Sequence, residues 1–274
     1  MATPIRRVPS HRSIPVQNPW FRAIKPVARP SLRLFCFPYA GGSGSIYQGW
    51  PAGLPTDVEV WTAQLPGRGP RLQTPAQTRL GPLLEDLSAA ITPWLDDAPF
   101  AFFGHSLGAL VAFELTRRLR RIGAPQPVRL CVSGRRAPHL PEPAPPIHGL
   151  PDAAFIERVR RLNGTSNEVL ENKELMALVL PSLRADFELA ETWSFLEEEP
   201  LSCALTVCAG LAEFGLWRDD IESWAYQTEG QCDVHFFPGD HFFIHSAATK
   251  LVATIGQTLH TDLGERHATL EQAG

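Results

Sequence analysis

One serine in this sequence stands in a setting that suggests chemistry. The segment FAFFGHSLGAL, residues 100–110, runs four apolar residues into the pattern G-x-S-x-G, and a helix-like apolar pattern follows it. A sharp strand-to-helix turn crowds its neighbours, so the positions beside the central residue must lack side chains. Such a turn exposes the central hydroxyl at the end of the strand, which predicts that Ser106 is a nucleophile. The alternative is that Ser106 only caps the helix.

A serine hydroxyl is a weak nucleophile near neutral pH, so a general base must lie within hydrogen-bond reach of it. The segment VHFFPGDHFFIH places His241 in a Gly-containing loop just after a predicted strand. Loops in that position gather over the same edge of the sheet as a serine turn. His235 falls within the strand, His245 belongs to the following helix, and His105 supports the turn beside the nucleophile. His241 is therefore the expected base.

A Gly-rich loop follows the first predicted strand, in the segment FCFPYAGGSGSIYQGW. Its small residues allow backbone N–H groups to approach a substrate carbonyl, which predicts the Ala40 N–H as one oxyanion donor. The second expected donor is the Leu107 N–H, at the start of the helix that follows the nucleophile. A phosphate-binding loop is the alternative, but the segment lacks the Lys of a P-loop and the G-x-G-x-x-G spacing of a dinucleotide site.

The elements that must position these residues alternate between strand-like and helix-like patterns. This alternation predicts a mostly parallel central sheet flanked by helices, a three-layer α/β fold. The strands are expected at 32–37, 58–65, 100–104, 128–133, 204–209 and 233–237, and the main helices at 81–95, 107–123 and 246–259.

One region breaks the alternation. After the Pro-rich stretch 137–151, residues 152 to about 199 read as consecutive helices with no strand between them. We expect a helical lid insertion over about 138–200; the alternative is extra helical packing without motion. The domain is expected to span 31–262, with an N-terminal extension at 1–30 and a C-terminal tail at 263–274.

Composition narrows the classes of function. The chain has 274 residues, of which 44% are hydrophobic, and a formal net charge of −4 at pH 7. A chain of this size buries a full core, and its charge offers no basic field for nucleic acid or an anionic membrane. We therefore expect one soluble domain without a nucleic-acid or membrane partner.

The cysteines and the N-terminus suggest where the protein works. The five cysteines are scattered, mostly among β-forming residues, which predicts buried thiols and a reducing compartment rather than a disulfide framework. The first 30 residues lack the continuous apolar core of a signal peptide, and no later run reaches transmembrane length. The expected location is the cytoplasm.

Six longer segments carry a family resemblance from about residue 19 to about residue 260. In order they are LFCFPYAGG, QLPGRGPRL, GHSLGA, SGRRAPHLP, LPSLRADFELAETW and FPGDHFF. The chain resembles the free-standing type II thioesterases of polyketide synthases and nonribosomal peptide synthetases, members of the α/β-hydrolase superfamily. The resemblance implies hydrolysis of acyl groups from the phosphopantetheine thiol of acyl or peptidyl carrier proteins, which removes stalled or aberrant chains. It also implies Ser106, His241, Ala40 and Leu107 in the roles given above, and no metal or organic cofactor.

The chain departs from the family pattern at the triad acid. Such enzymes usually carry an aspartate in the loop after the penultimate strand, where this sequence reads VCAGLAEFGLWRDDIESW. Aligning back from Trp224 places Glu213 at the acid position. Asp219 and Asp220 are nearby alternatives, although they look like residues at the start of a helix.

Two other functions stay open. One is a chain-releasing thioesterase or acyltransferase, and the other is a catalytically weak carrier-protein binding module. Acidic carriers suit a basic surface, and we expect it at the lid-side Arg158 and Arg161. The arginines at 117–121 instead close a helix, where cations favour the dipole without any partner. No pattern sets the oligomeric state, and we expect a monomer.

Overall fold

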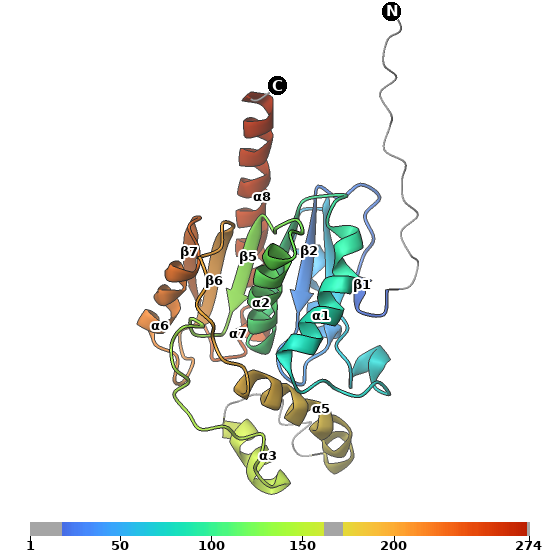
Figure 1. The fold of residues 1–274 in the computed structure, drawn as a ribbon, viewed down its shortest axis with the longest axis vertical. Coiled ribbons are helices and arrows are strands. Elements are labelled where there is room, and N and C mark those ends of the chain that lie inside the picture. The colour runs from blue at the N-terminus through green and yellow to red at the C-terminus, as the bar shows by residue number, and fades with distance from the viewer. Residues whose placement is uncertain (1–17, 162–171, 273–274) are drawn as a thin grey trace, which may run out of the picture.

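A seven-stranded sheet forms the centre of the fold (Figure 1). The computed structural model describes residues 18–161 and 172–272. Strand order is β1-β3-β2-β4-β5-β6-β7, and every pairing is parallel except that of β1 with β3. The predicted, mostly parallel sheet is confirmed. The strands are β1 (Phe21–Ala23), β2 (Leu32–Phe37), β3 (Val58–Ala63), β4 (Phe100–His105), β5 (Arg129–Ser133), β6 (Ala204–Gly210) and β7 (Cys232–Phe237).

Helices cover both faces of the sheet, which explains why its strands read as continuous apolar runs. Along β4, Phe102 packs into the core beneath α1 and α2, whereas Phe103 packs into the core beneath α8. Successive side chains of a strand point to opposite faces, so both must be apolar here. The helices are α1 (Leu80–Ile91), α2 (Leu107–Arg121), α3 (Asp152–Arg161), α5 (Lys173–Glu191), α6 (Arg218–Glu222), α7 (Phe243–Ser246) and α8 (Ala248–Gln272).

The helical insertion lies across the edge at which the parallel strands end. Figure 1 shows α3 and α5 beside this edge, and Leu189 near the end of α5 packs into the core beneath α1 and α2. The two helices share a small core of their own, in which Phe155 and Val159 of α3 meet Met176 and Leu183 of α5. Residues 162–171 of the predicted insertion lie outside the described residues. The insertion thus has its own packing and faces the loops that follow the strands.

The helix predicted to continue to about residue 199 ends at Glu191. Two arginines of α2 hold the chain beyond it in an irregular path. Arg117 is buried and pairs with Glu198 at 2.9 Å, and Arg120 donates to the backbone carbonyl of Glu199 at 2.8 Å. Both contacts lie beyond the end of α5 and tie the chain that follows it to α2. Arg117, Arg120 and Arg121 therefore pair with Glu198 of this segment, whereas Arg118 contacts Ser88 of α1.

The structure extends the domain at both ends. Residues 1–30 were expected to precede it, but Phe21–Ala23 form the edge strand β1, paired with Trp61–Ala63 of β3. Residues 263–274 were expected to form a frayed tail, but α8 runs to Gln272 and Leu263 packs against the core beneath it. The domain boundaries drawn at residues 31 and 262 are therefore too narrow.

All five cysteines are free, and four of them are buried. Burial raises the pKa of the Cys203 thiol to about 11 and that of Cys131 to about 12. Such thiols stay protonated and inert near neutral pH, as predicted for core cysteines. Among the described residues, no helix is both long and apolar enough to cross a membrane.

One buried cation ties α8 to the sheet. Arg129 of β5 donates two hydrogen bonds to Asp262, at 2.7 and 2.8 Å, and single bonds of 2.9 Å to Asp233 and to the Thr206 hydroxyl. Its exposed fraction is 3%. Removing one partner of such a buried pair leaves a charge without compensation.

Asp262→Ala is accordingly expected to lower the free energy of unfolding by about 3–5 kcal/mol, measured by chemical denaturation. Glu222→Ala is the control because its ion pair with Arg218 is exposed, and we expect a change within about 0.5 kcal/mol. Equal losses in the two variants would contradict the structural role of the Arg129 cluster.

Candidate active site

Ser106 occupies the sharp turn between β4 and α2. Its backbone dihedrals are φ 55° and ψ −111°, and among the described residues it is the one non-glycine with positive φ. A Cβ at Gly104 would lie 2.0 Å from the carbonyl oxygen of Gly108, and a Cβ at Gly108 would lie 2.0 Å from that of Phe37. Both contacts are far too short, so only glycine fits on either side of the serine. The turn is the strained one that the sequence pattern predicts.

Neighbouring backbone fixes the position of this turn. The Ser106 N–H donates to the carbonyl of Ser133, at the end of β5, at 2.8 Å. Ser106 directly precedes α2. The backbone N–H groups of the first turn of this helix, which include that of Leu107, therefore follow it directly and have no partner within the helix. A helix N-terminus favours negative charge, which suits a developing oxyanion.

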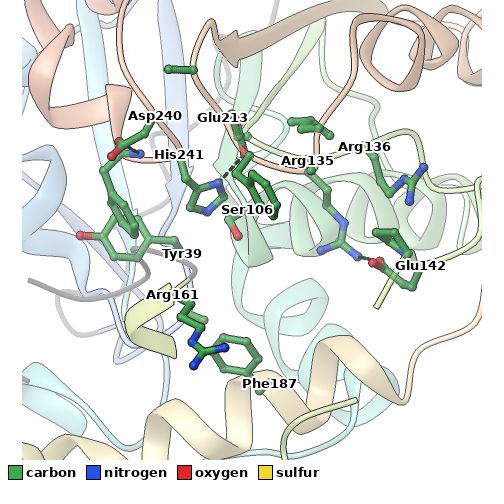
Figure 2. A pocket seen from close by; sticks show the side chains of 18 residues that line it. Tyr39, Ser106, Arg135, Arg136, Glu142, Arg161, Phe187, Glu213, Asp240 and His241 are labelled. Atoms are coloured by element: carbon green, nitrogen blue, oxygen red, sulfur yellow. Dashed lines mark hydrogen bonds and ion pairs between the residues drawn. The ribbon is translucent and has the colours of Figure 1, made fainter. Parts of the chain in front are cut away.

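His241 and Glu213 meet across two loops, although 28 positions separate them in the sequence. Nδ1 of His241 lies 2.5 Å from Oε1 of Glu213, and the Glu213 side chain is only 7% exposed. A carboxylate accepts hydrogen bonds and does not donate them, so it places the ring proton on Nδ1. Nε2 is then free to accept a proton, and Figure 2 shows Ser106 beside the ring of His241.

The two aspartates considered as alternative acids lie elsewhere. Asp220 accepts hydrogen bonds from Arg136 at 2.8 Å and from the backbone N–H of Trp217 at 3.1 Å. Asp219 is exposed in the first turn of α6. Of the three candidates, Glu213 is the one hydrogen-bonded to His241.

The other histidines considered as bases lie in the core, in a strand or against another side chain, and none of them is the histidine bonded to Glu213. His105 is fully buried, with Nδ1 at 2.8 Å from the Ser133 hydroxyl. Burial, followed by the charge of nearby His241, holds the pKa of His105 well below its ordinary value, so its ring stays neutral. His245 lies 2.9 Å from the Tyr39 hydroxyl, and His235 lies within β7. His105 packs beneath the turn, as the sequence analysis expects.

The Gly-rich loop turns just after β2. The Gly42 N–H donates to the Tyr39 carbonyl at 2.9 Å, and Gly41 has φ +73°, which is the geometry of a type II turn. Ala40 therefore lies at the apex of the loop. It lines the same pocket as Ser106 and His241, so the structure brings the expected donor to the candidate nucleophile.

A pocket of about 290 Å³ opens over these residues. Figure 2 shows Arg161 and Phe187 of the helical insertion on the wall opposite Ser106. Arg135 enters from the end of β5, and its side chain pairs with Glu142 at 3.5 Å. Sequence reasoning did not assign the pocket roles of Phe187 and Glu142. Their only signal is their position in or near segments that resemble the family, SGRRAPHLP and LPSLRADFELAETW.

Comparison with known proteins agrees with this geometry. Residues 32–259 match the thioesterase domain family. Linear gramicidin dehydrogenase LgrE of Brevibacillus parabrevis is 43% identical over 247 residues, 89% of this chain and 94% of the relative. The RedJ thioesterase from the prodiginine pathway in Streptomyces coelicolor has a TM-score of 0.78 at 38% identity, over 84% of this chain and 86% of that one. For the type II thioesterase BorB from the borrelidin cluster the TM-score is 0.80 at 29% identity, over 89% and 98%.

The name of the first relative is that of a dehydrogenase. In this chain the Gly-rich loop at 39–45 lacks the G-x-G-x-x-G spacing of a dinucleotide site, and a serine, a histidine and a glutamate meet at the pocket. The family match covers most of the chain and agrees with the fold and with the strained serine turn. The chain belongs to the thioesterase domain family, and it is a type II thioesterase with the α/β-hydrolase fold.

Proposed function

We propose that this thioesterase releases acyl groups from the phosphopantetheine thiol of acyl and peptidyl carrier proteins. In this proposal Ser106 is the nucleophile, His241 is the general base and Glu213 is the triad carboxylate that orients His241. The hydrogen bond between His241 and Glu213, beside a serine held in a strained turn, is the observation that carries the proposal. The similar thioesterases come from biosynthetic pathways and clusters, which supports carriers of such assembly lines as partners.

The reaction has two steps that use only protein groups and water. In the first, the Ser106 oxygen bonds to the thioester carbonyl carbon while Nε2 of His241 takes the hydroxyl proton; the C–S bond breaks and the thiol leaves with that proton. In the second, His241 takes a proton from water, whose oxygen attacks the acyl-serine. The carboxylic acid leaves, and Ser106 regains its proton. We therefore expect no requirement for a metal or organic cofactor.

Charge develops on the carbonyl oxygen in both steps. The N–H groups of Ala40 and Leu107 are the proposed donors to it, one from the loop after β2 and one from the start of α2. Glu213 holds His241 in the tautomer with Nε2 free and stabilises the imidazolium that forms during attack.

The pocket supports editing rather than release of a mature product. Its volume of about 290 Å³ is at the small end for ligand sites, which bury molecules in about 300–1,000 Å³. Phe187 and Leu216 add apolar surface to it. A short or wrongly primed acyl group fits this space.

Ser106→Ala should lower kcat for a short acyl thioester by several orders of magnitude, because no other group replaces the attacking oxygen. Stopped-flow release of free thiol measures it, with circular dichroism as the check on folding. A fluorophosphonate probe should label wild type at Ser106 alone. Turnover within tenfold of wild type, or labelling at another residue, would refute the nucleophile.

Glu213→Gln should lower kcat by at least about a hundredfold, since the amide no longer fixes the histidine tautomer. Asp219→Asn and Asp220→Asn serve as matched controls on the same segment and should stay within about tenfold. Steady-state kinetics on one acyl thioester compares all three. A larger loss in either aspartate variant would move the acid to α6, and no loss in any would indicate a Ser-His dyad.

Charge reversal at the mouth of the pocket tests the carrier partner. Arg161 is 68% exposed at the end of α3, and Arg158 lies one turn before it. Arg158→Glu with Arg161→Glu should lower kcat/KM for an acyl-carrier protein at least about tenfold relative to a small thioester, because acidic carriers are steered by positive charge. Arg22→Glu with Arg29→Glu, near the edge strand β1, is the control. Equal ratios in the two double variants would exclude docking at the lid-side arginines.

A further inference from the structure

A buried ion pair joins the helical insertion to the loop that follows β3. Arg68 of that loop and Asp186 of α5 lie 118 positions apart in the sequence, with exposed fractions of 8% and 2%. Nη1 of Arg68 lies 2.5 Å from one carboxylate oxygen, and Nη2 lies 2.7 Å from the other. This bidentate arrangement fixes the orientation of the carboxylate as well as its position.

The same carboxylate binds the backbone of the Gly-rich loop. Oδ2 of Asp186 accepts the Gly41 N–H at 2.7 Å, and Nη1 of Arg68 reaches the Gly42 carbonyl at 3.5 Å. Leu183, one turn earlier on α5, packs against Gly41 closely enough that a Cβ there would meet its Cδ1 at 2.9 Å. Helix α5 therefore holds the loop through a charge-assisted hydrogen bond and an apolar contact.

We propose that Asp186, oriented by Arg68, is the positioning residue of the oxyanion hole: its bond to the Gly41 N–H fixes the adjacent Ala40 N–H. This inference rests on the proposed function, in which Ala40 donates to the oxyanion. A donor must lie 2.7–3.1 Å from the oxyanion, and a misplacement of about 1 Å costs roughly a hundredfold in rate. Gly41 and Gly42 give this loop unusual backbone freedom, so an external anchor is needed.

Stability alone does not account for the pair. Replacing a buried ion pair by apolar groups of similar size is often neutral or stabilising, because both charges must leave water. What an apolar pair does not supply is an acceptor for the Gly41 N–H. The pair also joins α5 to the Gly-rich loop. The oxyanion hole is therefore complete only when α5 is packed against this loop.

Two double variants separate the hydrogen bond from the ion pair. Both carry Arg68→Met, and they differ in Asp186→Asn or Asp186→Leu, two side chains of similar shape. Neither has the buried charges, but only the asparagine offers an oxygen to the Gly41 N–H. Kinetics on a short acyl thioester, the affinity of a boronic acid that mimics the tetrahedral intermediate, and thermal unfolding are measured for both.

We expect kcat of the leucine double variant to fall at least about thirtyfold below that of the asparagine variant, because an oxyanion donor is worth about 10²–10³ in kcat. Boronic acid affinity should fall in parallel, while KM stays similar. Glu188→Gln is the control. Glu188 lies on α5 like Asp186, but it pairs with Arg79 at the surface and does not contact the Gly-rich loop. Its kcat should match wild type.

Equal kcat and boronic acid affinity in the two double variants would overturn the positioning role. If the leucine variant fails to fold, Asp186→Glu tests the proposal instead. This substitution keeps the carboxylate charge but displaces the acceptor oxygen, so a folded Asp186→Glu protein with wild-type kcat would contradict the proposal. Ser106→Ala separates failure of the positioning role from failure of the proposed function, because turnover in that variant refutes the proposed function itself.

Discussion

The backbone at Ser106 is the constraint to which the rest of the site conforms. A non-glycine residue at φ 55° costs about 1–3 kcal/mol, so the conformation persists only where its surroundings determine it. Here β4 lies between β2 and β5, and α2 packs so closely that Gly108 meets the Phe37 carbonyl. The Tyr47 hydroxyl donates to that same carbonyl at 2.6 Å. The strained turn and the start of the Gly-rich loop are thus held at one point.

A parallel sheet then brings the remaining groups of the candidate site to Ser106. Because parallel strands all end at the same edge, the residues that follow β2, β4, β5, β6 and β7 become neighbours in space. They are Ala40, Ser106, Arg135, Glu213 and His241, and all of them line one pocket. Each is placed by the end of a strand of this sheet, which is more rigid than a free loop.

The helical insertion supplies the part of the site that the sheet does not. Asp186 of α5 lies 145 positions after Gly41 in the sequence, and it contacts the loop after β2 through the Gly41 N–H. Charged side chains in the protein interior are paired, as Arg68 is with Asp186 and Arg129 with Asp262. Each pair joins an element late in the chain to an earlier one, which is the loop after β3 for Arg68 and the strand β5 for Arg129. These contacts fix how the layers are arranged around the strained turn.

The sequence by itself determined the α/β order, the strained turn at Ser106 and the position of His241 after the last strand, because apolar period and glycine placement are local properties. Its errors have a common cause. Residues 21–23 carry no strand pattern of their own and become β1 only through pairing with β3. The chain after Glu191, predicted as helix, lies in an irregular path against Arg117 and Arg120 of α2. Sequence reasoning also left three carboxylates open as the acid. Only the tertiary structure placed Glu213 against His241, since a hydrogen bond between distant loops depends on how strands order in the sheet, and no local pattern encodes that.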